Sequence, residues 1–166
     1  LIVFGNLPYN ISSQILVKFI KVANWPPNYN KLVFMFQKEV GEKIISKFKS
    51  KNYSRLSILT SARLKISKYF YVSKNCFFPK PKVESMVIEF VPITRKEIKF
   101  KYMETLEHVT NIFFSNRRKM INKAFKKLKI NDKIVKDYLN IDLKLRPENL
   151  SESQYYKITN FYEKNC

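Results

Sequence analysis

The sequence predicts an α/β domain followed by a small all-α domain. Two continuous apolar runs of strand length, residues 1–4 and 32–36, each precede a segment whose apolar residues recur at helical spacing. This order of strand, helix, strand and helix is typical of a sheet covered by helices. The last third of the chain is helical in pattern. We therefore expect the sheet in residues 1–91, a linker in residues 92–98 and a helical domain in residues 99–166.

The first part of the predicted sheet contains two strands and two helices. Residues 1–4 are uniformly apolar, which predicts a buried strand. Ser12 or Ser13 can cap the helix that follows, because a hydroxyl oxygen accepts a hydrogen bond from a free amide at a helix start. Residues 32–36 predict a second strand, buried on both faces as in a parallel sheet covered by helices. Residues 39–48 then predict a second helix.

The second part of the predicted sheet is an antiparallel pair of strands. Residues 56–72 are mixed in pattern and end in an aromatic, strand-like run. Residues 76–82 contain two prolines, and each proline removes a donor from a strand ladder, so this segment is a loop. Residues 83–91 place alternate apolar residues on one face of a strand. Because a loop joins the two strands, we expect them to pair at the end of the sheet.

The charge of the chain indicates a polyanionic partner. The 166 residues include 32 lysines and arginines against 13 aspartates and glutamates, which gives a formal net charge of +19. Such an imbalance opposes compaction and favours nucleic acid first and an anionic membrane second as partners. Codon bias in an AT-rich genome can contribute to the lysine excess, but it would raise the number of acidic residues as well. Nucleic acid is therefore the favoured partner.

The rare residue types exclude several kinds of site. Gly5 and Gly41 are far apart and are the only glycines, so this sequence has no glycine-rich phosphate loop. With Cys76, Cys166 and His108 as its only cysteines and histidine, the chain cannot assemble a Cys/His metal cluster, and no disulfide is expected. Free thiols favour a reducing, cytoplasmic location. No stretch approaches the roughly 18 apolar residues of a membrane span.

A short polar motif directly follows the first predicted strand. Asn6, Pro8 and Tyr9 lie just beyond its carboxyl end, where open α/β sheets bind ligands. Pro8 fixes the backbone, so the Asn6 side-chain oxygen and a main-chain carbonyl can together accept two hydrogen bonds from one amino group. Tyr9 offers a flat face to a planar ring. This set suits the exocyclic amino group of a stacked nucleobase; the alternative is an Asx turn with a core tyrosine.

Two stretches carry positive charge without any acidic residue. Residues 43–74 contain nine lysines and arginines, and residues 115–129 contain seven. The second stretch predicts a helix with an apolar stripe on its opposite side. Charge runs are commonly solvated faces, but a solvated face usually mixes both signs. We therefore expect phosphate contacts, which position RNA without reading its sequence.

Six blocks of the sequence follow one another in a fixed order and span almost the whole chain. They are N-L-P-Y at residues 6–9, M-x-Q-K-E-V at 35–40, Y-x-R-L-S at 53–57, F-x-P-x-P-K-V-x-S at 77–85, F-x-x-R-R-K at 114–119 and R-x-E-x-L-S at 146–151. The blocks resemble the motifs of the rRNA adenine N6,N6-dimethyltransferases, the KsgA family. Ser54 departs from the family, which has a glycine there. The chain resembles the last two-thirds of such an enzyme, without the N-terminal half that carries the glycine-rich S-adenosylmethionine loop.

The resemblance implies a fold and a reaction. The fold would be the second half of the Rossmann-like sheet of a class I methyltransferase, followed by a small helical rRNA-binding domain. The full-length protein would transfer methyl groups from S-adenosyl-L-methionine to the N6 amino group of adenines in small-subunit (16S) rRNA during ribosome biogenesis in bacteria. This chain alone would be inactive, because most of the cofactor site would lie upstream of it.

The resemblance also implies roles for individual residues. Asn6 and the Pro8 carbonyl would accept hydrogen bonds from the adenine amino group. Tyr9 and Phe77 would sandwich the base after it has swung out of its stack. Asn6 and Leu7 would contact the cofactor.

The remaining expectations concern packing, RNA and the competing functions. Phe78 is expected to pack in the core or within its loop. The partner would be small-subunit rRNA or the pre-30S particle, bound by a monomer without a metal or a membrane. Two alternatives stay open: a macrolide-resistance methyltransferase of large-subunit rRNA, and a non-catalytic RNA-binding or ribosome-assembly module. We expect RNA contacts from eight cations: Lys38, Arg55, Lys80, Lys82, Arg117, Arg118, Lys119 and Lys123.

Overall fold

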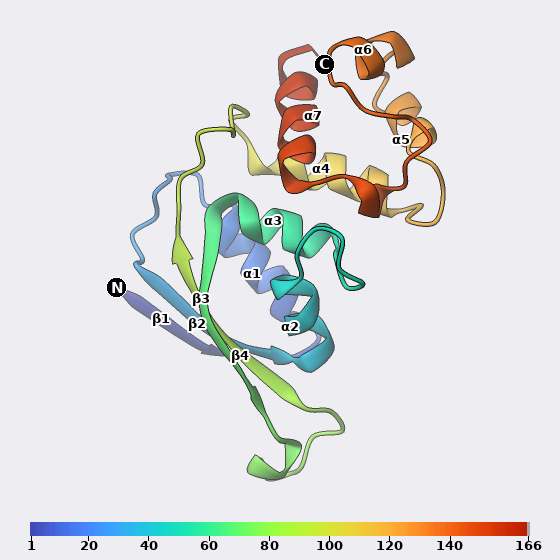
Figure 1. Cartoon of the computed structure of the whole chain (residues 1–166). Helices are drawn as coiled ribbons and strands as arrows, with labels where there is room; N and C mark the ends of the chain where they lie inside the picture. Colours follow the sequence, from blue (N-terminus) through green and yellow to red (C-terminus); the bar gives the residue numbers. More distant parts are fainter. Residues whose placement is uncertain (166) are drawn as a thin grey trace.

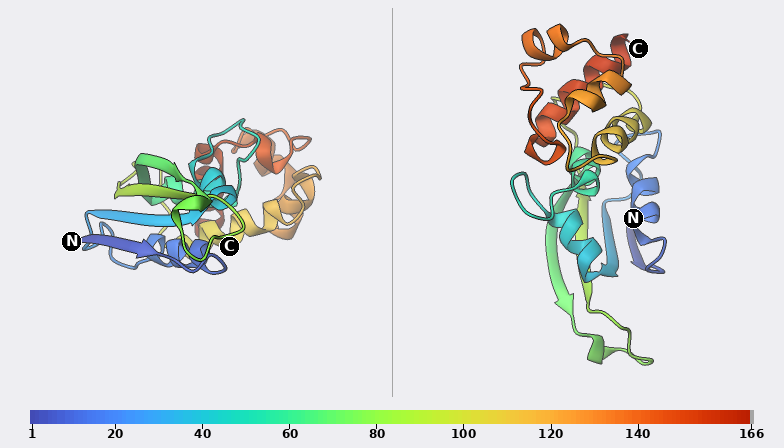
Figure 2. Two further views of the ribbon diagram at one scale, coloured as in Figure 1. Left: turned by 90° about the horizontal axis from the view of Figure 1, so that it is seen from below. Right: turned by 90° about the vertical axis from the view of Figure 1, so that its right-hand side faces the viewer.

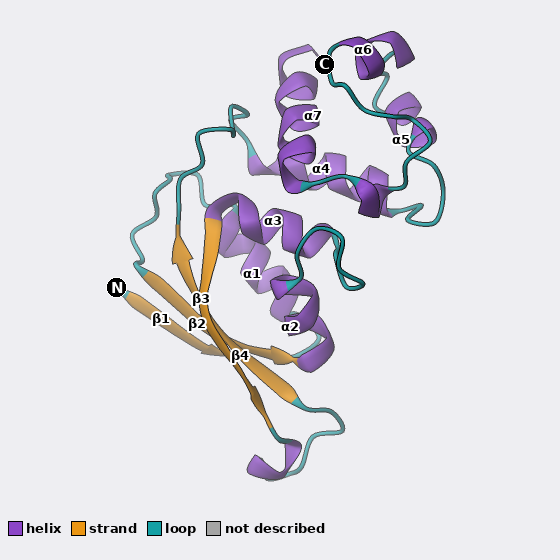
Figure 3. Cartoon of the chain, viewed as in Figure 1, coloured by secondary structure: helices purple, strands orange, loops and turns teal. Residues whose placement is uncertain are grey.

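The computed structural model describes residues 1–165, which contain a four-stranded sheet and several helices (Figures 1 and 3). The strand order is β1-β2-β4-β3. β1 (Ile2–Asn6) and β2 (Lys31–Gln37) are parallel. β4 (Ser85–Pro92) is antiparallel to both β2 and β3 (Leu64–Val72). The predicted α/β sheet, with an antiparallel pair at its end, is confirmed.

Helices cover one face of this sheet. α1 (Ser12–Ile20), α2 (Lys38–Ile45) and α3 (Arg55–Arg63) form that layer in Figure 1. The residues between the buried positions of β2 are only partly buried, so the prediction that this strand is buried on both faces is wrong. The reason is that these side chains point away from the layer of helices. Alternate residues of β2 and β4 are buried beneath the helices: Leu32, Phe34, Phe36, Met86, Ile88 and Phe90.

β1 is an edge strand and is not buried as predicted. Phe4 is 74% exposed, and Ile2 is half exposed. Within residues 1–165, β2 is the one strand that pairs with β1. The pairing of Phe4 with Val33 places the Phe4 side chain on the face opposite the buried Leu32. A run of apolar residues thus predicts the strand correctly, but burial also requires a covering layer.

β3 and β4 form a long hairpin that extends beyond the helices (Figures 1 and 2). The sequence segment of mixed pattern, residues 56–72, forms most of α3 and the whole of β3. A short helical turn, η1 (Lys74–Cys76), and the proline-containing loop join the two strands. Near the loop end of the hairpin ladder, α2 packs so closely on β4 that a Cβ atom on Gly41 would lie 2.5 Å from Met86 Sδ. This close approach explains the glycine.

The C-terminal part of the chain is a group of packed helices (Figure 1). Phe113 of the first helix packs against Tyr155 of the last, with ring centres 5.4 Å apart. Phe125, from the predicted apolar stripe, contacts Phe113 at 5.1 Å and is fully buried. The elements are α4 (Met103–Phe114), α5 (Asn122–Lys127), α6 (Asp132–Asp137), η2 (Pro147–Asn149) and α7 (Glu152–Asn165).

The start of α1 differs from the prediction. The residue that caps this helix is Ile11, and no side chain bonds to the free amides there. The Ser12 hydroxyl instead donates to the Tyr9 carbonyl at 3.1 Å. Because this bond points backwards along the chain, it fastens the start of α1 to the loop after β1.

Two other sequence expectations concern membranes and cysteines. Within residues 1–165, no helix combines the length and apolar character needed to cross a membrane. Cys76 is an exposed free thiol in η1. Cys166 lies outside the described residues, so the expected absence of a disulfide stays a prediction.

Candidate nucleic-acid interface

The ends of four strands bring the predicted base-binding residues to one edge of the sheet. β1 and β2 are parallel, so their carboxyl ends, at Asn6 and Gln37, lie at the same edge. Gln37 pairs with Ser85, and Ser85 pairs with Val72. The start of β4 and the end of β3 therefore lie there too. The loop after β1 and the loop between β3 and β4 meet at this edge.

Tyr9 is held at this edge by β4. Its hydroxyl shares a hydrogen bond of 2.5 Å with Oγ of Ser85, which is fully buried. The Tyr9 ring is only partly buried and keeps surface for another ring, and Asn6 is exposed. The Pro8 carbonyl accepts a hydrogen bond from Ile11 N at 3.1 Å. Because a carbonyl oxygen has two lone pairs, it can still accept a second bond from a ligand.

The proline-containing loop presents its two phenylalanines differently. Phe77 is partly buried, whereas Phe78 is fully exposed. The prediction that Phe78 packs in the core or within its loop is wrong, because the loop projects beyond the helices that could cover it (Figure 2). Lys80 and Lys82 are also exposed. The loop therefore offers aromatic rings and cations together.

Lys38 fastens this loop to the start of α2. Its Nζ donates to Glu84 Oε2 at 2.8 Å, and its backbone N–H donates to the Glu84 carbonyl at 2.9 Å. The hydrogen bond between the two side chains raises the pKa of Lys38 and lowers the pKa of Glu84. Lys82 lines a cavity of about 370 Å³ together with this pair. Lys38, a predicted RNA contact, is thus already bound to a carboxylate.

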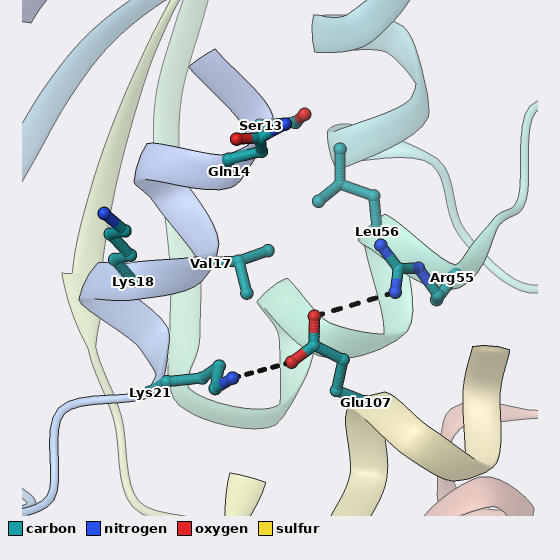
Figure 4. Close-up of a pocket in the computed structure, with 8 residues that line it drawn as sticks. All are labelled: Ser13, Gln14, Val17, Lys18, Lys21, Arg55, Leu56 and Glu107. Atoms are coloured by element: carbon teal, nitrogen blue, oxygen red, sulfur yellow. Dashed lines mark hydrogen bonds and ion pairs between the residues drawn. The ribbon is translucent and has the colours of Figure 1, made fainter. Parts of the chain in front are cut away.

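A groove of about 420 Å³ runs between α1, α3 and α4 (Figure 4). Glu107 of α4 reaches into it, where Oε2 accepts a hydrogen bond from Lys21 Nζ at 2.8 Å and Oε1 lies 3.7 Å from Arg55 Nη1. The bond to Glu107 raises the pKa of Lys21. Arg55 also donates to Asn111 Oδ1 at 2.5 Å. Arg55 therefore joins α3 to α4, and its contact with RNA stays a prediction.

The predicted basic helix of residues 115–129 is interrupted. α4 ends at Phe114, and Arg117, Arg118 and Lys119 lie in the turn before α5. Ser115 lies at the end of α4, where its hydroxyl donates to the Ile112 carbonyl at 2.8 Å. The cations are therefore presented by a turn and a short helix.

The two basic stretches meet at this turn. Arg117 Nε donates to Glu148 Oε2 at 2.9 Å, and its Nη2 donates to the Lys51 carbonyl at 3.0 Å. Arg117, Lys49 and Lys51 line a cavity of about 580 Å³. Sequence reasoning missed this meeting, since no spacing rule pairs residues so far apart. Arg118, Lys119 and Lys123 are exposed nearby.

The predicted site residues thus fall into two groups. Asn6 and Tyr9 lie at the edge of the sheet where β4 begins, and Phe77 and the lysines of the proline-containing loop lie in the segment that leads into β4. Arg55 lies where α3 contacts α4. The cations around α5 lie on the surface of the helical part. A ligand that uses both groups has to be long and anionic.

Comparison with known proteins defines the class of the molecule. The mixed sheet with its loops at one edge has the Rossmann-like methyltransferase fold, as in the solved structures described below. More narrowly, the chain belongs to the family described as ribosomal RNA adenine dimethylase, whose model matches residues 1–164.

Curated relatives carry the name Ribosomal RNA small subunit methyltransferase A. The protein of Pelagibacter ubique is 45% identical over 161 residues, which cover 97% of this chain and 61% of the relative. The protein of Ehrlichia chaffeensis is 39% identical over 158 residues, which cover 95% of this chain and 59% of the relative. This chain therefore spans about three-fifths of the length of these relatives.

Solved structures agree with this assignment. A dimethyladenosine transferase from Plasmodium falciparum superposes with a TM-score of 0.77 at 26% identity, covering 98% of this chain and 66% of that chain. The 23S rRNA methyltransferase ErmE superposes with a TM-score of 0.62 at 17% identity, covering 99% of this chain and 65% of that chain. The second likeness shows the fold alone. The predicted family and fold class are confirmed.

Proposed function

We propose that this chain is the adenine-presenting and RNA-binding part of an enzyme that dimethylates N6 of adenines in small-subunit (16S) rRNA during ribosome biogenesis. One observation carries the proposal: the hydrogen bond between the Tyr9 and Ser85 hydroxyls fastens the loop after β1 to the strand that follows the Phe77 loop. The names of the curated relatives support the small subunit as the source of the substrate.

The residues at this edge suit methyl transfer to an amino group. N6 of adenine is a weak nucleophile, because its lone pair is delocalised into the ring. Hydrogen bonds from its two N–H groups to the Asn6 side-chain oxygen and the Pro8 carbonyl localise the lone pair on nitrogen. Tyr9, fixed by Ser85, and Phe77 hold the flipped base between them. Transfer then depends on positioning rather than on acid–base chemistry.

S-adenosyl-L-methionine is the cofactor that we propose. The exposed Asn6 amide and the backbone at Leu7 have donors and acceptors that fit the polar methionine part of this molecule. When bound, the cofactor supplies an electrophilic sulfonium methyl group. Gly5 and Gly41 cannot form a glycine-rich loop, so most of the cofactor site has to come from residues that this chain does not contain.

The proposed partner is small-subunit rRNA within a pre-30S particle in the bacterial cytoplasm. The exposed cations Lys80, Lys82, Arg118, Lys119 and Lys123 are the main phosphate contacts. Lys38, Arg55 and Arg117 contribute less, since each already lies close to a carboxylate. The net charge of +19 opposes self-association, so we propose a monomer. Residues 1–91 and 99–166 form the two domains, joined by residues 92–98.

A second function is favoured by the same scarcity of glycine. A chain without a cofactor loop can act as a non-catalytic RNA-binding or ribosome-assembly module. The two functions differ in one requirement, because only the enzyme needs Asn6 and the Pro8 carbonyl to engage an amino group.

A chimera tests the proposal. The part of the Pelagibacter ubique relative that this chain does not match is joined to this chain and supplied with labelled S-adenosylmethionine. We expect N6,N6-dimethyladenosine in small-subunit rRNA and none in large-subunit rRNA, which serves as the control substrate. Methylation of the large-subunit rRNA alone would identify the macrolide-resistance type of enzyme. A folded chimera that binds RNA without methylating it would contradict the enzymatic proposal and support the non-catalytic assembly module.

A further inference from the structure

Two tyrosines of β3 are exposed beside the proposed adenine-binding edge. Tyr69 and Tyr71 are 51% and 50% exposed, and their rings meet edge to face with centres 6.4 Å apart. The Nζ atom of Lys38 lies 5.4 Å from the centre of the Tyr71 ring. We call Tyr69, Tyr71 and the adjacent Lys38 ammonium group the β3 tyrosine patch, which combines two flat rings with a cation. Neither ring is needed to fill the core.

The patch adjoins the site through Lys38. Tyr71 pairs with Met86, so its side chain lies on the helix-covered face of the sheet, whereas Ser85, one residue before Met86, points to the opposite face. The Nζ atom of Lys38 lies 5.4 Å from the centre of the Tyr71 ring and 2.8 Å from Oε2 of Glu84, the residue before Ser85. The patch and the residue that holds Tyr9 therefore lie at the same end of the hairpin, where a strand bound at Tyr9 can extend to the patch.

The charges around the patch favour a polyanion. Lys65 and Lys68 are exposed on the same strand, and Lys74 and Lys82 lie in the loop beyond it. The nearby carboxylate of Glu84 is already bound to Lys38 at 2.8 Å. Glu39 is likewise bound to Lys43 at 2.7 Å, and Glu89, which pairs with Lys68, is bound to Lys31 at 3.2 Å. Among the described residues, Glu42 is the remaining nearby carboxylate, so the lysines of the strand and loop are in excess.

The same charges oppose a protein strand or a second copy of the chain. β3 is the outer strand of the sheet, and lysines on an edge strand discourage pairing with another strand. Two copies of a chain with a net charge of +19 repel each other. Exposed aromatic rings among lysines are instead the arrangement on which single-stranded nucleic acids stack.

We propose that the β3 tyrosine patch stacks the nucleotides that flank the target adenine and so selects single-stranded RNA at the site. This inference rests on the proposed function and adds a binding surface to it. Stacking is tolerant of sequence, because every base has a flat face. The patch would therefore hold the strand near the site while the loop residues select the adenine.

Photo-crosslinking to this chain provides the test. The probe is a single-stranded RNA of about nine nucleotides, within the range of site lengths for single-strand binding proteins, with one adenine and 5-iodouridine beside it. We expect crosslinks to the peptide that contains Tyr69 and Tyr71. In parallel, Tyr71→Ala should weaken binding of this RNA by about fivefold or more, and Tyr71→Phe should retain it.

Tyr138 provides the matched control. It is 63% exposed with Lys157 Nζ at 5.7 Å from its ring, but it lies in the helical part. Tyr138→Ala should leave binding of the probe unchanged. If crosslinks form only in the helical part, or if Tyr71→Ala binds as tightly as the unaltered chain, the inference is overturned while RNA binding stands. If the unaltered chain binds no RNA, the proposed function fails together with it.

Discussion

Ser85 decides how Tyr9 is presented. The two residues are far apart in the sequence, and their 2.5 Å hydrogen bond forms only because β4 lies beside β2. The sequence motifs predicted that Tyr9 offers a ring, but no spacing rule identifies its anchor. The same limit applies to Phe78, since a residue's type does not reveal that its loop projects beyond the helices. Sequence motifs thus predict which chemical group a residue offers better than they predict what the residue contacts.

Phe77 and Phe78 make a matched pair in the chimera. Phe77→Ala should lower the methylation rate by up to about a hundredfold, because the flipped base loses a stacking partner. The affinity for long RNA should hardly change, since phosphate contacts dominate it. Phe77→Trp should retain most activity. Single-turnover rates and binding titrations measure both effects. A larger loss of rate in Phe78→Ala than in Phe77→Ala would contradict this prediction, because it would assign the stacking role to Phe78.

At the scale of elements, the periodicity of apolar residues predicted most strands and helices, but it did not predict the burial of β1 or where α4 ends. The alternation in β4 predicted the buried face correctly, because it reports on one strand alone. Burial of β1 was predicted wrongly, since it depends on a neighbouring layer. The continuous helix of residues 115–129 was also wrong, because α4 ends at Phe114 and α5 begins only at Asn122. The periodicity of one segment could not predict properties that depend on a neighbouring helix or strand.

Gly41 tests the packing of α2 on β4. A Cβ atom there would lie 2.9 Å from the Met86 Cβ, so Gly41→Ala should overpack the core and lower the free energy of unfolding by about 1–3 kcal/mol. In a Met86→Ala background the contact with Sδ at 2.5 Å is gone while the contact with Cβ at 2.9 Å remains, so the same change should cost less than in the unaltered chain. Urea unfolding of the four proteins gives the coupling. Equal effects in both backgrounds would mean that the contact is absent.

At the scale of the whole molecule, the net charge should make RNA binding depend strongly on salt. Each phosphate contact to a single strand contributes about −0.7 to the slope of log K against log salt. The double change Arg118→Ala and Lys119→Ala should therefore reduce the slope by about 1.4. Lys133→Ala with Lys136→Ala on α6 is the control and should leave it unchanged. An unaltered slope in the first variant would make the turn an ordinary solvated surface.

The chain on its own should not methylate RNA. Its two glycines are too far apart to form a cofactor loop, so S-adenosylmethionine cannot be held for transfer. Incubation of the chain with small-subunit rRNA and labelled cofactor should leave the RNA unlabelled, while the chimera serves as the positive control. Measurable turnover by the chain alone would show that it holds the cofactor in a way that the motifs do not describe.

The most direct test of the account is the methylation rate of the Asn6→Ala chimera. Removing one acceptor for the adenine amino group should slow the chemical step by about 10²–10³, by analogy with the loss of an oxyanion-hole donor. Affinity for RNA should stay the same, and Asn10→Ala, a change at an exposed neighbour, should retain the full rate. Dimethylation by Asn6→Ala at the unaltered rate would contradict the claim that this edge of the sheet presents the adenine.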